Sequence, residues 1–236
     1  MKENRQCDKQ QQGSKENREL ETWLNVMKIV EDKRIEFGPY FSYQIENNIR
    51  HLLFTFSRYK FASQMIGEEP RKSVLELGCS EGIGTIFLSE IATTVKAVDF
   101  DEQTLQWPKN ALSDRNIEFI CDDFMEKQFG EFDAVVSLDV IEHINAEKED
   151  AFLNTLVMNL NNDGVAIIGT PNIAASAYAS EASRIGHINL YDQQRLKNLL
   201  LRGFRNVFIF GMNDEVLHTG FHPMCHYIFA LACNKR

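Results

Sequence analysis

The stretch VLELGCSEGIGT, residues 74–85, constrains the fold of this chain more than any other. An apolar run ends at Leu77 and opens into Gly78, Gly82 and Gly84, after which apolar residues recur at helical spacing. This pattern predicts a strand, a tight turn and a helix. Glycines suit such a turn because they adopt positive φ and let a ligand approach the backbone. We therefore expect a bound ligand there, and a side chain at Gly78 should block it while the fold survives.

A second apolar run, residues 95–98, ends in Asp99, about 20 residues after the first glycine. An acidic side chain at that remove can accept hydrogen bonds from both hydroxyls of a ribose, so the unit predicts a nucleoside-bearing cofactor. The G-x-G-x-x-G pattern of dinucleotide-binding turns is absent, because Cys79 and Ser80 follow Gly78. An NAD-dependent oxidoreductase is the alternative interpretation, which this missing pattern disfavours.

The composition favours an enzyme that acts on small molecules. Apolar residues make up 44% and charged residues 25% of the 236, which suffices for one sizeable core. The net charge of −9 argues against a nucleic-acid surface. No apolar run is long enough to span a membrane and the N-terminus is charged, so we expect a cytoplasmic protein without a membrane partner. The five cysteines lack C-x-x-C spacing and predict free thiols, and the oligomeric state stays open.

The chain is expected to have three parts. Residues 1–19 mix both charge signs with Gln and Asn and predict a disordered tail. Residues 20–68 hold two amphipathic runs, 20–35 and 43–66, and predict an N-terminal helical cap. Residues 69–236 form the cofactor-binding domain. Three aromatic residues of the cap are either a lid over the substrate or core residues: Tyr40, Phe41 and Tyr43.

From residue 74 onward apolar strands alternate with amphipathic helices, which predicts an α/β fold of the Rossmann-like, doubly wound type. The strands of this parallel sheet are expected at 74–77, 95–98, 117–121, 134–138 and 165–169. The last two apolar runs, 206–210 and 226–232, have no helix between them and should pair antiparallel at one edge.

The glycine turn resembles motif I of the class I S-adenosylmethionine-dependent methyltransferases, E/D-x-G-x-G-x-G. Glu76, Gly78 and Gly82 match it, whereas Ser80 replaces the middle glycine. The resemblance covers about Leu53 to the C-terminus, and it implies a methyltransferase with S-adenosyl-L-methionine as cofactor and an antiparallel last strand.

The resemblance also assigns cofactor contacts. The segment IEFICDDF looks like the family's adenine-binding segment, with Asp123 at the amino group and Phe124 against the ring. Asp122 is the fallback, and a helix-capping Asp is the alternative. Ten residues are expected to bind the cofactor: Glu76, Gly78, Cys79, Ser80, Gly82, Asp99, Phe100, Asp123, Phe124 and Leu138.

The segment FDAVVSLDVIEHI should deliver Asp139, Glu142 and His143 to the carboxyl end of a strand, where catalytic groups gather in this architecture. In many methyltransferases this is motif IV. Methyl transfer is an in-line displacement that needs an aligned nucleophile and removal of its proton. His143 is the natural base because its ordinary pKa lies near neutrality, and Asp139 is the second catalytic candidate.

The spacing Asp139-x-x-Glu142-His143, joined by His187, resembles the E-x-x-E-H…H metal set of the small-RNA 3′-terminal ribose methyltransferases and the ubiquinone-pathway O-methyltransferases. The resemblance implies that these four residues bind Mg²⁺ or Mn²⁺, which would gather adjacent substrate oxygens. Asp139 is one methylene shorter than the Glu of those families. The alternative is a metal-free site in which His143 is the base and His187 only hydrogen-bonds.

These resemblances imply O-methylation of a small acceptor: a sugar, a phosphorylated metabolite or a diol. The segment from Gly169 through Tyr191 looks like bacterial methyltransferases associated with surface-polysaccharide clusters. An RNA ribose methyltransferase is the other alternative, which the acidic charge opposes.

Overall fold

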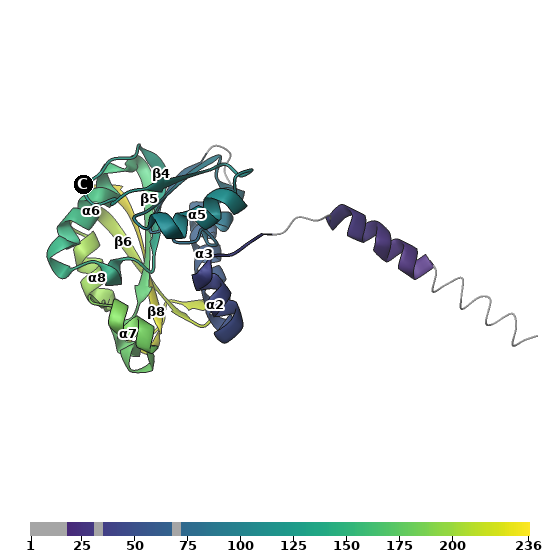
Figure 1. Cartoon of the computed structure of the whole chain (residues 1–236). Coiled ribbons are helices and arrows are strands. Elements are labelled where there is room, and N and C mark those ends of the chain that lie inside the picture. Colours follow the sequence, from purple (N-terminus) through teal and green to yellow (C-terminus); the bar gives the residue numbers. More distant parts are fainter. Residues whose placement is uncertain (1–17, 31–34, 68–71) are drawn as a thin grey trace, which may run out of the picture. The chain divides into compact units, whose positions relative to one another are not determined.

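The computed structural model describes residues 18–30, 35–67 and 72–236 (Figure 1). The chain divides into two units, Met1–Glu36 and Phe37–Arg236. In the first unit, residues 18–30 form a helix, so the helix expected from residue 20 starts two residues earlier. Residues 1–17 of the expected tail, and residues 31–34 of the expected helix, lie outside the described residues.

The second unit is an α/β domain. Its strands are β1 (Ser73–Leu77), β2 (Thr94–Asp99), β3 (Ile117–Cys121), β4 (Phe132–Leu138), β5 (Leu160–Pro171), β6 (Phe204–Asn213), β7 (Val216–His218) and β8 (Tyr227–Lys235). Its α-helices are α2 (Pro39–Asn47), α3 (Ile49–Ile66), α4 (Thr85–Ile91), α5 (Glu102–Ala111), α6 (Glu149–Met158), α7 (Glu181–Gly186) and α8 (Gln193–Leu200). Its short 3₁₀ turns are η1 (Ile141–His143), η2 (Ala146–Lys148), η3 (Ile173–Tyr178) and η4 (His222–Met224).

The eight strands of the described residues form one sheet in the order β3-β2-β1-β4-β5-β8-β6-β7. β1 to β5 run parallel, whereas β8 pairs antiparallel with both β5 and β6. The predicted Rossmann-like fold and its antiparallel last strand are thus confirmed. The strand order reverses between β1 and β4, and ligands of doubly wound sheets bind beyond the carboxyl ends of the strands at such a point.

Helices cover both faces of the sheet (Figure 1). On one face, Tyr59, Ala62 and Ile66 of α3 pack with Leu88 of α4 against β1, β2, β4 and β5. On the other face, Phe152 and Leu156 of α6 share a core cluster with residues of α8. Because α3 belongs to the same packed layer as α4, its polar side chains can reach the carboxyl edge of the sheet.

The helix expected over residues 43–66 is instead two helices. Asn48 has φ −154° and ψ 66°, which interrupts the helical backbone between α2 and α3. Three apolar residues of this amphipathic run are also exposed: Ile45, Ile49 and Leu53. The buried face of α3 carries small residues between its large ones: Leu52, Thr55, Tyr59, Phe61, Ala62, Ser63 and Ile66. Small residues allow the helix to approach the sheet closely, a requirement that apolar spacing does not encode.

Within the described part of the chain, no helix combines the length and the apolar character that crossing a membrane requires.

Candidate active site

Backbone hydrogen bonds join the glycine turn to the end of β2 and hold the Asp99 carboxylate. The Gly78 N–H donates to the Val98 carbonyl over 2.8 Å. The Ser80 N–H donates to Asp99 Oδ2 over 2.8 Å, and the Asp101 N–H donates to Oδ1 over 3.1 Å. Ser80 adopts φ +48°, so it takes a left-handed conformation without being a glycine. Each Asp99 oxygen keeps acceptor capacity for a ribose hydroxyl.

Glu76 lies beneath this turn, fully buried on β1. The Tyr59 hydroxyl from α3 donates to Glu76 Oε1 over 2.6 Å, while Oε2 has no hydrogen-bond partner among the described residues. Burial raises the pKa of the Glu76 carboxyl to about 7. Glu76 therefore connects the turn to α3, and its oxygens face the protein interior.

The free energy of unfolding should depend on pH through the protonation of this buried carboxyl. Between about pH 4.5 and 7 the folded protein keeps a proton that the unfolded chain releases, so Glu76 makes the free energy of unfolding fall as pH rises. Glu76→Gln cannot titrate and still accepts from Tyr59. We expect it to flatten the change in melting temperature between about pH 5 and about pH 8 and to melt above wild type at the higher pH. If the melting temperatures of the two proteins changed equally with pH, Glu76 would not be the cause of the pH dependence.

Three of the four predicted metal ligands converge beyond the carboxyl end of β4. Glu142 and His143 lie in η1, and His187 directly follows α7. One ligand atom from each residue lies within 4.8 Å of the other two. The rings of His143 and His187 meet edge to face, with centroids 5.0 Å apart. Glu142 is fully buried and His143 is exposed, so solvent reaches the group from the imidazole side.

Contacts from other elements orient this group. The Thr170 hydroxyl donates to Glu142 Oε2 over 2.9 Å, and Oε1 is buried without a hydrogen-bond partner among the described residues. His143 Nδ1 lies 2.9 Å from the Gly186 carbonyl oxygen. Because a carbonyl only accepts, Nδ1 carries the proton and Nε2 is left as an acceptor.

The electrostatics of the group are compatible with a bound cation. Burial, reinforced by the charge of Asp139, raises the pKa of Glu142 to about 8. Burial, reinforced by the charge of His143, lowers the pKa of His187. A divalent ion stabilises the carboxylate against protonation and binds neutral imidazole, so these residues fit a metal site.

Asp139 does not join this group, contrary to the sequence expectation. Its carboxylate accepts two hydrogen bonds from Arg58 Nη1 of α3, over 2.9 and 2.8 Å. The described residues that form the metal-like cluster accordingly omit Asp139. The spacing alone placed Asp139 among the ligands, whereas an arginine 81 residues earlier determines where its side chain points.

Comparison with known proteins agrees with this architecture. Residues 74–164 match the sequence profile of a family described as a methyltransferase domain. Together with the sheet order and the Asp99 turn, this match supports a class I S-adenosylmethionine-dependent methyltransferase domain in this part of the chain. The match is thus to methyltransferases and not to the oxidoreductases that the sequence left as an alternative.

Relatives and solved structures extend the comparison. The methyltransferase domain resembles a ubiquinone biosynthesis O-methyltransferase of Rickettsia prowazekii, 25% identical over 166 residues, which cover 68% of this chain and 62% of the relative. A probable S-adenosylmethionine-dependent methyltransferase of Mycobacterium tuberculosis is 28% identical over 170 residues, which cover 67% and 58%. The chain therefore spans less than two thirds of these relatives. The methyltransferase domain of bacterial CtHen1 has the same fold, with a TM-score of 0.64, 16% identity and coverage of 77% and 99%.

Some of the other predicted cofactor contacts are buried in the structure, and some are exposed. Phe124 is buried in the core against Phe152, so its ring is not free to stack on an adenine, and that expectation is wrong. Asp123 is exposed and accepts the Met125 N–H, as a turn residue does. Phe100 is 76% exposed beside Asp99, which leaves its ring available. Three further predicted residues line the turn or the β4 end and are buried or nearly so: Cys79, Gly82 and Leu138.

Glu81 is a functional candidate that the sequence interpretation passed over. It follows Ser80 in the turn, and its two carboxylate oxygens accept the N–H groups of Tyr40 (2.8 Å) and Phe41 (3.0 Å) at the start of α2. The first turn of α2 is thereby anchored on the cofactor turn. Phe41 is buried, whereas Tyr40 and Tyr43 are exposed, so only the latter two remain available as lid residues. An acidic residue within a glycine turn is the sequence feature that could have identified Glu81.

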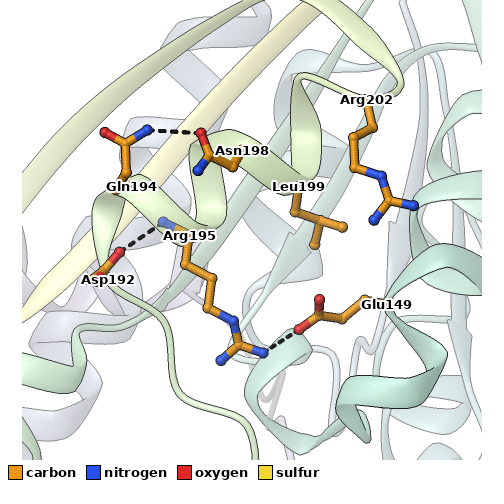
Figure 2. Close-up of a pocket in the computed structure, with 7 residues that line it drawn as sticks. All are labelled: Glu149, Asp192, Gln194, Arg195, Asn198, Leu199 and Arg202. Atoms are coloured by element: carbon orange, nitrogen blue, oxygen red, sulfur yellow. Dashed lines mark hydrogen bonds and ion pairs between the residues drawn. The ribbon is translucent and has the colours of Figure 1, made fainter.

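A surface recess of about 400 Å³ lies between α6 and α8 and contains none of the predicted site residues (Figure 2). Its lining includes the ion pair of Glu149 with Arg195. Glu149 also accepts a hydrogen bond from Asn189, whose own N–H donates to the Glu142 carbonyl. The residues of this recess therefore brace the segment that follows His187.

Proposed function

We propose that this protein transfers a methyl group from S-adenosylmethionine to an oxygen of a small acceptor that carries neighbouring oxygens. The sugar, phosphorylated metabolite or diol expected from the sequence all have this chemistry. The observation that carries the proposal is the convergence of Glu142, His143 and His187 just after Val140, which lies against Gly78 of the cofactor turn. The names of two relatives support it, since one is an O-methyltransferase and the other depends on S-adenosylmethionine.

The residues of the turn fit the cofactor. Asp99, oriented by the N–H groups of Ser80 and Asp101, would accept hydrogen bonds from the ribose hydroxyls. Gly78 and Gly82 hold the positive φ with which the turn would wrap the amino-acid portion of the cofactor.

Glu142, His143 and His187 would hold a divalent ion such as Mg²⁺ or Mn²⁺. Bound there, the ion would supply Lewis-acid chemistry, lowering the pKa of an acceptor hydroxyl. The Gly186 carbonyl keeps the His143 Nε2 lone pair directed outward, and Thr170 holds Glu142. These contacts serve the second interpretation equally, in which His143 Nε2 takes the acceptor proton directly.

Two measurements test the proposed function. Titration calorimetry should show binding of S-adenosylhomocysteine and none of NAD, and the reverse pattern would refute the cofactor. Incubation with methyl-labelled S-adenosylmethionine and a metabolite extract should label a small molecule on oxygen. Label on nitrogen or carbon, or on RNA in a parallel reaction, would refute the proposed acceptor class.

Asp99→Ala should weaken cofactor binding by about 1–3 kcal/mol, because it removes the ribose acceptors and leaves ligand hydroxyls unpaired. The affinity for S-adenosylhomocysteine, measured by calorimetry, checks this. Asp163→Ala is the matched control, since Asp163 is exposed near the start of β5. Unchanged affinity in a folded Asp99→Ala protein would show that another residue binds the ribose.

A further inference from the structure

Arg58 occupies an unusual place for a cation of the N-terminal helices. Its side chain, 12% exposed, extends from α3 to the carboxyl edge of the sheet and pairs with Asp139 over 2.8 Å. Its guanidinium carbon lies 4.0 Å from the ring centroid of Tyr227, the buried first residue of β8. Arg58 therefore connects three elements at the place where β4 ends.

Asp139 is a critical position for the turn that follows β4. It adopts φ +59°, a left-handed conformation that is uncommon for residues with a side chain, although Asp tolerates it better than most. Its N–H donates to the Gly169 carbonyl over 3.0 Å, and its carboxylate is held by Arg58. Glu142 and His143 follow three and four residues later, so the conformation of Asp139 sets where they point.

The ion pair also balances charge. An unpaired Asp139 would be a second carboxylate beside the buried Glu142, and it would attract any nearby cation. Paired with Arg58, it is neutral as a unit and both of its oxygens are engaged. The Glu142, His143 and His187 group is therefore left with one carboxylate.

We propose that Arg58 is a positioning residue of the methyl-transfer site, which holds Asp139 outside the metal group and thereby makes this a three-ligand site. The inference rests on the proposed function, since it concerns the same metal group. Arg58 contacts neither the proposed ligands nor the cofactor turn by any hydrogen bond of the described residues. It acts by pairing with Asp139 and by balancing the charge of that carboxylate beside Glu142.

Binding of Mn²⁺ to the full chain, measured by calorimetry, distinguishes a positioning Arg58 from a merely structural one and from a site in which Asp139 is a ligand. Arg58→Met removes a cation and frees a carboxylate, so Mn²⁺ should bind about tenfold more tightly. Asp139→Asn leaves Arg58 unpaired and should weaken Mn²⁺ binding about tenfold. The double variant Arg58→Met/Asp139→Asn removes both charges and no ligand, so its affinity should lie within about threefold of wild type.

The double variant decides the question. If Asp139 were a ligand, the double variant would lose at least about tenfold in Mn²⁺ affinity, and that result would overturn the inference. A merely structural Arg58 would give weaker binding in Arg58→Met, which also overturns it. Because either single variant leaves a charge unpaired and can fail to fold, the double variant keeps the test available.

Two further measurements complete the design. Arg115→Met breaks a surface pair with Glu90 and should leave Mn²⁺ affinity unchanged, which controls for loss of an arginine. S-adenosylhomocysteine affinity should stay at the wild-type value in every variant. Wild-type protein that binds S-adenosylhomocysteine but no Mn²⁺ would refute the metal part of the proposed function and this inference together. Mn²⁺ binding by wild type with equal affinity in Arg58→Met refutes the role of Arg58 alone.

Discussion

Removal of divalent metal is expected to abolish methyl transfer while cofactor binding persists. Glu142, His143 and His187 converge from two separate segments, which a lone base does not require. A chelator would leave the Asp99 turn intact, because that turn contains none of these residues. We therefore expect EDTA-treated enzyme to bind S-adenosylhomocysteine normally, to transfer no methyl group, and to recover with Mg²⁺ or Mn²⁺.

His187→Ala should reproduce the effect of the chelator, since it removes one ligand and leaves both residues of η1 in place. His226→Ala is the matched control, because His226 is exposed and lies outside the metal-like group. The competing interpretation makes the opposite forecast: activity survives EDTA, His143→Ala loses about 10²–10⁴-fold in rate, and His187→Ala loses much less. Full activity in metal-free enzyme would end the metal hypothesis.

Local sequence patterns were sufficient for the fold and for the position of the cofactor turn. Strand periodicity and turn glycines depend on neighbours a few residues away, and the antiparallel pairing of β8 followed from the lack of a helix between two apolar runs. The place of Asp99 beside the turn followed in the same way, because its distance from Gly78 is fixed by one strand–helix–strand unit.

Residues positioned by distant contacts could not be predicted. Asp139 matches a ligand by spacing, but Arg58, which belongs to a different helix, determines its contacts. Phe124 was assigned to the adenine by its place after β3, although its ring packs against Phe152 of α6. In both cases the deciding neighbour lies in an element packed from elsewhere in the chain, and no motif carried that information. The short helix α7, which brings His187 to His143, was likewise not predicted.

The structure changes the expectation for Gly78, whose replacement should cost stability and not only cofactor binding. Gly78 holds φ +83°, and a Cβ atom there would lie 2.3 Å from Cγ2 of Val140, so the glycine turn and the turn after β4 touch at this point. Gly78→Ala combines a left-handed alanine, about 1–2 kcal/mol, with overpacking of about 1–3 kcal/mol. The sum of about 2–5 kcal/mol should lower the melting temperature by about 4–20 °C. Gly78→Val should not fold.

Gly67→Ala is the control that isolates the steric part of this effect. Gly67 has nearly the same φ, +82°, but a Cβ there meets nothing within 4 Å. The Gly67→Ala variant should therefore lose only the conformational part of the stability, about 1–2 kcal/mol. The difference between the two variants measures the clash with Val140, and Gly78→Ala/Val140→Ala should recover part of it. If Gly78→Ala melted together with Gly67→Ala, the turn would have room for a side chain, and the need for glycine would lie with the cofactor, as the sequence first indicated.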